Sequence, residues 1–326
     1  MFRTIGFPVG SKENEKRRAL ILKDIQSFPY KGQLVFEKDY GAVLGFSNKD
    51  LINAGVQVAN REEVLKQDVI CDPKAGDGDY IASLKKGQIL FGWIHAVQNK
   101  ALTSQLVKQG ITAVAWEDMN EKGRHVFWRN NEIAGEAAAL HAIEQIGVLP
   151  YELKVAILGR GNTARGAYKS FMGLGADVTV YDRKTEKLFR EEAPKYDVLV
   201  NGILWDITRT DHIIYKEDLK KMKPGSLIID VSCDEGKGIE TTRPTTIDNP
   251  VYMIDGIYHY AVDHTPSIFH ASTSRSLSDV MAVYLPYFIE RDEKNNTVLQ
   301  KATIIKDGKI IDKKIIDFQH IPSLYA

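Results

Sequence analysis

The spacing of apolar residues along the chain predicts short strands that alternate with helices. In the first 130 residues, apolar runs of strand length occur at Thr4–Pro8, Leu34–Glu37, Val56–Val58, Val69–Asp72, Ile89–Trp93 and Ala113–Trp116. Stretches of helical spacing lie between several of these runs, at Asn48–Ala54, Arg61–Lys66 and Lys100–Lys108. Because strands that alternate with helices form parallel sheets, this segment predicts an α/β domain.

A second alternating series follows a long helical stretch, Glu132–Ile146, which Gly147 and Pro150 end. Its predicted strands are Lys154–Leu158, Val178–Tyr181, Val198–Asn201, Ser226–Val231 and Tyr252–Ile254. Beyond them, Ser274–Ile289 has the spacing of an amphipathic helix, and the runs on either side of Asp307-Gly308 predict a hairpin. The second series therefore predicts a separate domain, after which the chain returns to the first.

A glycine turn follows the first strand of the second series. Gly159, Gly161 and Ala164 stand in the order G-x-G-x-x-A, and the next strand ends at Asp182, 23 residues after Gly159. Gly159 permits a tight turn, Gly161 lets a pyrophosphate approach the backbone, and Ala164 lets the helix pack on the strand. Such a glycine pattern alone is often an ordinary turn, but the flanking strands and the acid favour a dinucleotide site, with phosphates at the helix N-terminus.

These patterns together predict the fold class and the domain order. We expect an α/β protein with two Rossmann-like parallel-sheet domains. The dinucleotide-binding domain spans 132–273 and is inserted into a discontinuous substrate domain, formed by 1–131 and by the helix and hairpin of 274–326.

Composition limits the classes of function. The 326 residues include 43 basic and 43 acidic side chains, so no net charge attracts nucleic acid or an anionic membrane. No apolar run approaches the roughly 20 residues of a membrane span, and the N-terminus lacks the pattern of a signal peptide. Cys71 and Cys233 show neither a disulfide framework nor metal-ligand spacing. We expect a cytoplasmic enzyme of small molecules without a bound metal.

Charged residues follow three predicted strands of the first domain. Arg17 and Arg18 lie in a charged loop after Thr4–Pro8, where they are either carboxylate clamps or ordinary surface charges. Lys74 follows Val69–Asp72 through Pro73, and His95 ends the apolar run that starts at Ile89. A lone histidine is usually structural, but a lysine and a histidine at the carboxyl ends of two strands predict a shared site suited to proton transfer.

Polar residues of the second domain leave alternatives open. Asp230 is either a buried or a loop-capping acid, whereas Asp234 is placed to reach a ligand, and His264 lies in a polar segment that spacing alone does not separate from a turn. The chain has no nucleophile elbow, Walker loop or zinc cluster. Hydride transfer is the chemistry that remains.

Several ordered motifs, up to about Tyr287, resemble the alanine dehydrogenase and pyridine nucleotide transhydrogenase family. They are Lys12-Glu13-Asn14-Glu15-Lys16-Arg17, Asp72-Pro73-Lys74, Gln88 to His95, Asn131 to Gly135, Gly173 to Val180, Asp230 to Asp234, and Glu240 to Thr246 with its specific Arg243-Pro244-Thr245-Thr246. The resemblance implies that Arg17 and Lys74 hold the carboxylate and carbonyl of a keto acid. It implies further that His95 handles protons and that Asp234 lies beside the nicotinamide.

The resemblance also implies the cofactor contacts and a homo-oligomer. The contacts fall on Gly159, Gly161, Asn162, Thr163, Ala164, Asp182, Arg183, Lys184, Asn201, Gly202 and His264. Alanine dehydrogenases usually have asparagine where His264 stands, and this chain lacks their full V-P-x-T-S-T segment and has a shorter connection before Lys154. The closest resemblance is instead to members that join pyruvate to the side-chain amine of ornithine, or less readily lysine, and reduce the imine with NADPH. By charge alone, Arg18 and Arg129 are candidates to bind the second carboxylate.

Alternatives remain open for the cofactor and for the reaction. Asp182 favours NAD, because it would repel a 2′-phosphate, whereas Arg183 and Lys184 favour NADP, as does the resemblance. An alanine or saccharopine-type dehydrogenase using NAD is a second enzyme reading. A redox sensor without turnover is a third, and Lys74, His95 and Asp234 argue against it because a sensor needs no proton-transfer group.

Overall fold

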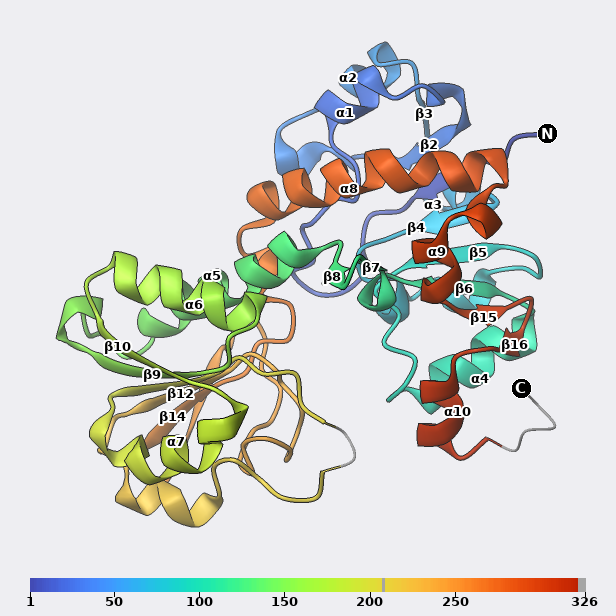
Figure 1. Cartoon of the computed structure of the whole chain (residues 1–326). Coiled ribbons are helices and arrows are strands. Elements are labelled where there is room, and N and C mark those ends of the chain that lie inside the picture. The colour runs from blue at the N-terminus through green and yellow to red at the C-terminus, as the bar shows by residue number, and fades with distance from the viewer. Residues whose placement is uncertain (207–208, 322–326) are drawn as a thin grey trace. The chain divides into compact units, whose positions relative to one another are not determined.

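The computed structural model describes residues 1–206 and 209–321, and the chain divides into two units (Figure 1). The first unit comprises Met1–Phe127 and resumes at His270, and the second unit is Trp128–Phe269. The second unit is thus inserted into the first along the chain. The sequence analysis places these boundaries after residues 131 and 273, inside the helices that begin at Trp128 and His270.

The sheet of the first unit has the strand order β16-β15-β6-β5-β4-β1-β2-β3. Neighbouring strands from β6 to β3 are parallel, whereas β15 pairs antiparallel with both β6 and β16. The strands are β1 (Ile5–Phe7), β2 (Leu34–Glu37), β3 (Gln57–Ala59), β4 (Val69–Cys71), β5 (Ile89–Gly92), β6 (Thr112–Ala115), β15 (Thr303–Lys306) and β16 (Lys309–Ile310). A small hairpin, β7 (Asn120–Glu121) with β8 (Arg124–His125), forms its own sheet.

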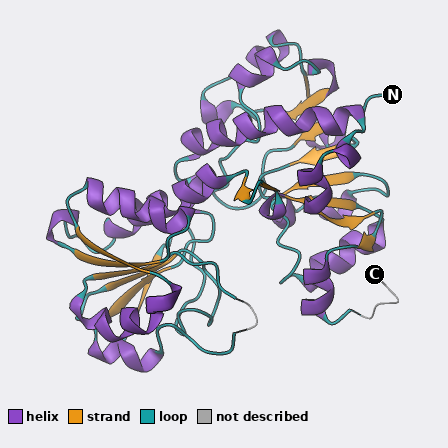
Figure 2. Ribbon diagram, viewed as in Figure 1, coloured by secondary structure: helices purple, strands orange, loops and turns teal. Residues whose placement is uncertain are grey.

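Helices cover both faces of this sheet (Figure 2). They are α1 (Leu22–Ser27), α2 (Asn48–Asn53), α3 (Arg61–Val64), α4 (Lys100–Gln109), α8 (His270–Glu290), α9 (Thr297–Ala302) and α10 (Lys313–Gln319). Alternate residues of one strand enter different cores: Phe91 of β5 packs with Phe288 of α8, whereas Leu90 packs with the cluster that includes Leu106 of α4. Burial on both faces explains why these strands read as continuous apolar runs.

The sheet of the second unit has the order β10-β9-β11-β12-β14-β13, parallel except for the antiparallel pair β13 and β14. Its strands are β9 (Lys154–Leu158), β10 (Asp177–Tyr181), β11 (Val198–Asn201), β12 (Leu227–Asp230), β13 (Val251–Ile254) and β14 (Ile257–Tyr260). Its α-helices are α5 (Trp128–Ile143), α6 (Asn162–Gly173) and α7 (Glu186–Glu192). The two mainly parallel sheets confirm the predicted fold class of two Rossmann-like α/β domains.

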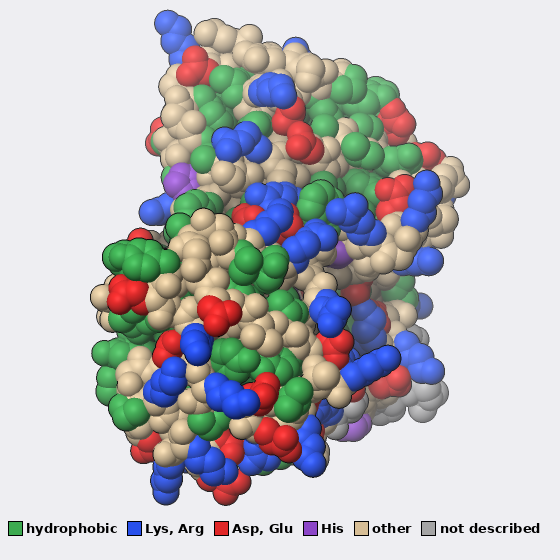
Figure 3. All heavy atoms as spheres, turned by 60° about the vertical axis from the view of Figure 1, so that its left-hand side comes forward, with side chains coloured by type: hydrophobic (Ala, Val, Ile, Leu, Met, Phe, Trp, Pro, Cys, Tyr) green, Lys and Arg blue, Asp and Glu red, His purple; other side chains and the backbone are tan. Residues whose placement is uncertain are grey.

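Short 3-10 helices connect these elements. They are η1 (Lys31–Gln33), η2 (Ala42–Leu44), η3 (Ala75–Asp77), η4 (Ile81–Ser83), η5 (Trp116–Asp118), η6 (Pro150–Glu152), η7 (Arg183–Thr185), η8 (Ala193–Lys195), η9 (Lys216–Lys221), η10 (Thr265–Ser267) and η11 (Glu293–Asn295). No helix among the described residues is long and apolar enough to cross a bilayer. On the face shown in Figure 3, basic and acidic side chains are interspersed, in keeping with their equal numbers.

The predicted C-terminal hairpin is confirmed, and the structure adds its partner. Asp307 and Gly308 both have positive φ, 49° and 76°, as a two-residue hairpin turn requires. Beyond the hairpin itself, β15 extends the parallel sheet by pairing with β6, which is far away in sequence. The sequence analysis missed β14, whose turn from β13 runs through Asp255 and Gly256, both with positive φ.

Two glycines let α5 and α6 pack at backbone contact. A Cβ at Gly166 would lie 1.8 Å from the carbonyl oxygen of Glu132, and one at Gly135 would lie 1.9 Å from that of Thr163. Real Cβ atoms do not approach an oxygen so closely, so any side chain at either position would push the helices apart. This contact holds α6, which begins at the glycine turn, against the rest of the second unit.

We expect Gly166→Ala to lower the free energy of unfolding of the second unit. Alanine favours a helix by about 1 kcal/mol over glycine, but overpacking against the Glu132 carbonyl costs about 1–3 kcal/mol or more. Gly173→Ala, at the last residue of α6, is the matched control, since nothing lies within 4 Å of its added Cβ. Urea unfolding of both variants measures the difference. Equal stability of the two would show that the helices separate without cost.

Candidate functional site

Arg17, Lys74 and His95 follow neighbouring parallel strands of the first unit. β1 leads into the loop that carries Arg17, β4 into the segment with Lys74, and β5 into the turn with His95. β5, β4 and β1 are adjacent in the sheet, in that order. Because the carboxyl ends of parallel strands meet at one edge, the three residues belong to the edge where open α/β sheets bind ligands.

Arg17 is held by a buried carboxylate and an indole. Its Nε and Nη2 donate to the two oxygens of Glu15 at 2.9 and 2.6 Å, and its backbone N–H donates to Glu15 Oε1 at 2.8 Å. Its guanidinium lies 4.9 Å from the ring centroid of Trp93, which directly follows β5. Both Arg17 and Glu15 are buried. A bidentate pair and a stacked ring fix the plane of the guanidinium, as recognition of a planar carboxylate requires.

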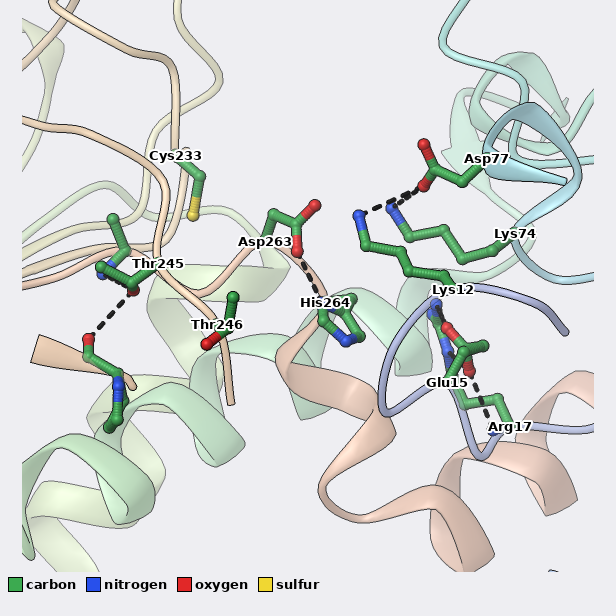
Figure 4. A network of polar contacts seen from close by, with 12 residues as sticks. Lys12, Glu15, Arg17, Lys74, Asp77, Cys233, Thr245, Thr246, Asp263 and His264 are labelled. Atoms are coloured by element: carbon green, nitrogen blue, oxygen red, sulfur yellow. Dashed lines mark hydrogen bonds and ion pairs between the residues drawn. The ribbon is translucent and has the colours of Figure 1, made fainter. Parts of the chain in front are cut away.

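Lys74 shares a carboxylate with a second lysine. The Nζ atoms of Lys74 and Lys12 lie 3.1 and 3.2 Å from Asp77 Oδ2 (Figure 4). Burial acts to raise the pKa of Asp77, but the charges of Lys74 and Lys12 outweigh it and lower that pKa below its usual value. Asp77 is therefore ionised at neutral pH, and the cluster keeps a net positive charge that suits an anionic substrate.

The backbone of Lys74 is anchored by a fully buried acid. Asp72 Oδ1 accepts a hydrogen bond from Lys74 N at 2.9 Å, and Asp72 Oδ2 accepts one from the Tyr80 hydroxyl at 2.8 Å. Burial raises the pKa of Asp72 to about 6, against the lowering effect of these hydrogen bonds. Asp72 thus fixes the chain at the end of β4.

His95 has an unusual backbone and a shifted imidazole. Its φ of 52° lies in the left-handed region, which few non-glycine residues adopt. Although the residue is exposed at the surface, the protein groups around it displace water and lower the pKa of the imidazole below 6.5. Glu117 opposes this shift and Lys74 adds to it, so Lys74 and His95 belong to one electrostatic cluster. The imidazole is therefore mainly neutral at pH 7 and able to accept a proton.

The glycine turn of the second unit has the geometry of a phosphate-binding loop. Gly159 has a φ of 121°, and a Cβ there would lie 3.0 Å from the carbonyl oxygen of Gly202. Gly161 is the N-cap of α6, no side chain caps this end of the helix, and nothing lies within 4 Å of an added Cβ. Ala164 is buried and would meet a Cβ at Gly202 at 3.0 Å. Open space in front of uncapped N–H groups fits a pyrophosphate.

A pocket of about 380 Å³ adjoins this turn. It is lined by Gly159, Arg160, Gly161, Asp182, Arg183, Lys184, Gly202, Ile203 and Leu204. Asp182 caps η7: its Oδ1 accepts from Lys184 N at 3.0 Å, and its Oδ2 lies 3.2 Å from Arg160 Nε. The residues present therefore fit the adenosine side of a dinucleotide, and basic side chains outnumber the acid in the pocket.

The remaining predicted site residues of the second unit lie at the start of α6 and in the segments after β12 and β14. Asn162 and Thr163 form the first turn of α6, where the Asn162 side chain accepts from Arg165 Nη2 at 3.1 Å. His264 is buried, its Nδ1 lies 2.5 Å from Asp263 Oδ1, and it is the N-cap of η10 (Figure 4). Asp234, in the loop after β12, accepts from the Ser232 hydroxyl.

Asp230 is a buried structural acid at the end of β12. It accepts hydrogen bonds from Asn201 Nδ2 at 2.9 Å and from Thr242 Oγ1 at 2.7 Å. Burial raises the pKa of Asp230 to about 6, and these hydrogen bonds offset only part of that rise. Asn201 is therefore engaged in joining β11 to β12 through its side chain.

We expect Asp230→Asn to gain stability relative to the parent as the pH rises from 4 to 7. A folded pKa raised from 3.8 to about 6 means that the folded state binds the proton more tightly. The contribution of Asp230 to stability is thus present below about pH 4 and is lost as the pH rises through 6. The change reaches up to about 3 kcal/mol. Unfolding of both proteins at pH 4, 5.5 and 7 measures it, and a pH-independent difference would contradict the assignment.

Arg18 and Arg129, the candidates by charge for a second carboxylate site, both have partners within the fold. Arg18 is buried, and its guanidinium donates to the carbonyl oxygens of Tyr40 and Arg17 at 2.6 and 2.8 Å. Arg129 pairs with Glu132 and Glu136 on its own helix. Both guanidinium groups therefore support the local fold, and their part in substrate binding stays a prediction.

Sequence reasoning missed the acids that hold the cationic groups: Glu15, Asp77 and Glu117. Glu15 and Asp77 lie within three residues of Arg17 and Lys74, so their opposite charge close by in the sequence was a usable signal. Glu117 is distant in sequence from His95 and left no such signal. Among residues 1–206 and 209–321, no three His, Cys, Asp or Glu side chains gather as a metal site. Cys71 and Cys233 are not joined to each other.

A glycine turn with the geometry to bind phosphate in one unit and a cationic cluster beside an imidazole in the other are features of a dinucleotide-dependent oxidoreductase. Models of the alanine dehydrogenase/PNT N-terminal and C-terminal domains match residues 6–131 and 183–313. The chain belongs to the alanine dehydrogenase/PNT family. The glycine turn itself lies between the two matched ranges.

Individual relatives agree with this membership. An N(5)-(carboxyethyl)ornithine synthase of Clostridium botulinum is 31% identical over 303 residues, covering 86% of this chain and 93% of the relative. An alanine dehydrogenase of Halomonas elongata is 26% identical over 330 residues, covering 89% and 88%. A solved L-alanine dehydrogenase has a TM-score of 0.83 at 21% identity, and the match covers 97% of this chain and 99% of the solved chain. This match establishes the shared fold.

Proposed function

We propose that this enzyme joins pyruvate to the side-chain amine of ornithine, or of lysine, and reduces the resulting imine with NADPH. The product is N5-(1-carboxyethyl)ornithine or its lysine counterpart. The observation that carries the proposal is the set of Arg17, Lys74 and His95 at the carboxyl ends of β1, β4 and β5. The names and coverage of the most similar relatives support the choice of substrates.

Arg17 and Lys74 suit a 2-keto acid. A guanidinium fixed by Glu15 and Trp93 can bind a carboxylate through two parallel hydrogen bonds. The Lys74 ammonium can polarise the keto oxygen and stabilise the negative charge that develops there during attack. Because Asp77 is shared with Lys12, its charge only partly neutralises Lys74.

His95 suits the proton movements of imine formation. The neutral imidazole accepts a proton from the side-chain ammonium, and the freed amine attacks the keto carbon of pyruvate. A proton then passes from the attached nitrogen to the former keto oxygen, which becomes a hydroxyl. The imidazolium then returns the proton to the departing hydroxyl, which leaves as water, so the proton balance closes. NADPH, when bound, supplies the hydride that reduces the imine carbon, so that the C=N group becomes a secondary amine.

The second unit would hold the cofactor through the glycine turn and its pocket. We propose that the pyrophosphate binds the N-terminus of α6 at Gly161, Asn162 and Thr163, with Gly159, Ala164 and Gly202 shaping the turn. Asn201, Asp234 and His264 remain proposed contacts on the nicotinamide side. NADP is favoured because Asp182 is already engaged by Lys184 N and Arg160, while Arg160, Arg183 and Lys184 supply positive charge for a 2′-phosphate.

A second candidate is an alanine dehydrogenase that uses NAD. The acid at Asp182, which suits an unmodified ribose, and the similarity to the Halomonas relative favour it. The two candidates differ in the amine that they use, ammonia or a diamino acid, and in the cofactor.

The test follows oxidation of NADPH and NADH with pyruvate and each amine in turn. We expect rapid oxidation of NADPH with ornithine or lysine and little with ammonia, and mass spectrometry should find the N-carboxyethyl product. Oxidation of the cofactor with pyruvate and ammonia but not with a diamino acid, or at the same rate with ammonia as with a diamino acid, would refute the synthase and support the alanine dehydrogenase. No turnover with any amine would leave a binding protein.

A further inference from the structure

Glu117 contacts the loop of His95 through both of its oxygens. It lies on η5, directly after β6, which is the strand next to β5. Its Oε1 accepts from the backbone N–H of His95 at 2.6 Å, and its Oε2 accepts from that of Ile94 at 3.2 Å. Two consecutive amide groups at the end of β5 are thus tied to one carboxylate from the neighbouring strand.

The backbone at His95 requires such support. A residue with a side chain in the left-handed region costs about 1–2 kcal/mol, and it persists only where the surroundings enforce it. The loop after β4 contacts the same turn, since Gly76 N donates a hydrogen bond to the Trp93 carbonyl oxygen at 2.9 Å. A Cβ at Gly76 would lie 2.1 Å from the Ile94 carbonyl oxygen. The backbone of the turn is therefore held by two neighbouring segments, and Glu117 supplies the charged contact.

We propose that Glu117 is a positioning residue, which holds His95 in its strained turn and tunes by its negative charge how readily the imidazole takes up a proton. The inference rests on the proposed role of His95 as the proton carrier. Glu117 needs no contact with substrate for this role, because it acts through the backbone of the turn and through its charge.

The charges around His95 give the direction of the effect. Burial, Lys74 and Lys12 lower the pKa of the imidazole, whereas Glu117 and Asp77 raise it. On the same 3-10 turn, Asp118 pairs with Lys314, which also interacts with Asp312 and Glu117. Without the charge of Glu117, the largest effect that raises the pKa of His95 among the charged neighbours is lost, so this pKa falls further.

The experiment compares Glu117→Gln with Glu117→Asp and with Asp118→Asn, the matched control one residue away. NMR titration of labelled histidine in the cofactor-free protein measures the titration midpoint of His95, whose signal is assigned by its absence in His95→Gln.

For Glu117→Gln we expect a His95 midpoint lower by about half a pH unit or more. We also expect a kcat lower by about 10- to 100-fold, at unchanged NADPH affinity. Glu117→Asp keeps the charge but shortens the side chain, so kcat falls and the midpoint stays. Asp118→Asn leaves kcat within about twofold.

The proposal is overturned if Glu117→Gln retains the parent kcat, or if its His95 midpoint does not move more than that of Asp118→Asn. If Glu117→Gln does not fold, Glu117→Asp decides, and parent-like turnover there overturns the positioning role. Failure of the proposed function looks different, since the parent itself would then show no turnover that depends on a diamino acid, and failure of the role of His95 would leave His95→Gln with full turnover. A parent-like Glu117→Gln beside an inactive His95→Gln would reject only the role of Glu117.

Discussion

Replacing His95 with glutamine is expected to lower kcat by about 10²- to 10⁴-fold, the usual range for loss of a general acid–base group. Glutamine has similar size and polarity, but it cannot carry a proton from the ammonium to the departing hydroxyl. The pocket proposed to bind the nucleotide is lined by residues of the second unit, whereas His95 belongs to the first, so we expect the Kd for NADPH to stay the same. Steady-state assays and a fluorescence titration of NADPH measure the two quantities.

The pH profile adds a second expectation for His95. A pKa lowered below 6.5 keeps the imidazole neutral to lower pH, so kcat/KM for the diamino acid should rise with pH through a midpoint below 6.5. His95→Gln should lack this rise. His320→Gln, the same change at an exposed residue of the first unit, is the control and should keep both the rate and the profile. Equal losses of turnover and of NADPH affinity in His95→Gln would contradict the assigned role.

Replacing Lys74 with methionine is expected to lower kcat/KM for pyruvate by about 10²- to 10³-fold, as for loss of one oxyanion-stabilising donor. Methionine preserves the length of the side chain in a buried position but removes the positive charge beside the keto oxygen. Because Lys12 and Asp77 remain, the fold of the cluster should persist. Initial rates over a range of pyruvate concentrations, with thermal unfolding as a check of the fold, measure the effect.

Lys12→Met provides the comparison, since Lys12 binds the same oxygen of Asp77 at nearly the same distance. We expect a smaller loss, because Lys12 contributes charge to the cluster and is not assigned to the keto oxygen. Identical losses in the two variants would mean that net charge alone matters, and Lys74 would then have no specific part in substrate binding.

Much of the fold could be predicted because local patterns carry it. The Leu34–Glu37, Lys154–Leu158 and Val198–Asn201 strands have the predicted bounds, since buried strands of a parallel sheet are apolar on both faces. The Asp307-Gly308 turn has the backbone angles that its residue types favour. The antiparallel pairing of β15 with β6 was not predictable, since it joins segments far apart in sequence that have no pattern in common.

The candidate site also has a part that could be predicted from local sequence and a part that could not. Lys74 and His95 could be named because each directly follows an apolar run, and the glycine turn because its spacing is local. Their acid partners were not predicted, although Asp77 lies only three residues from Lys74. Arg18 and Arg17 are adjacent in sequence, yet Arg18 donates to backbone carbonyls while Arg17 pairs with Glu15. Only the packing around each side chain separates the two.

The sequence by itself therefore determined the two α/β units, the glycine turn with Asp182 after it, and the basic and imidazole groups at the ends of β1, β4 and β5. Periodicity and turn chemistry act over a few residues, which is why they can be read from the chain. The tertiary structure decided which acid holds which group: Glu15 for Arg17, Asp77 for Lys74 and Glu117 for His95. Charge interactions and hydrogen bonds depend on distance in space, and for Glu117 and His95 that distance is set by the pairing of β5 with β6.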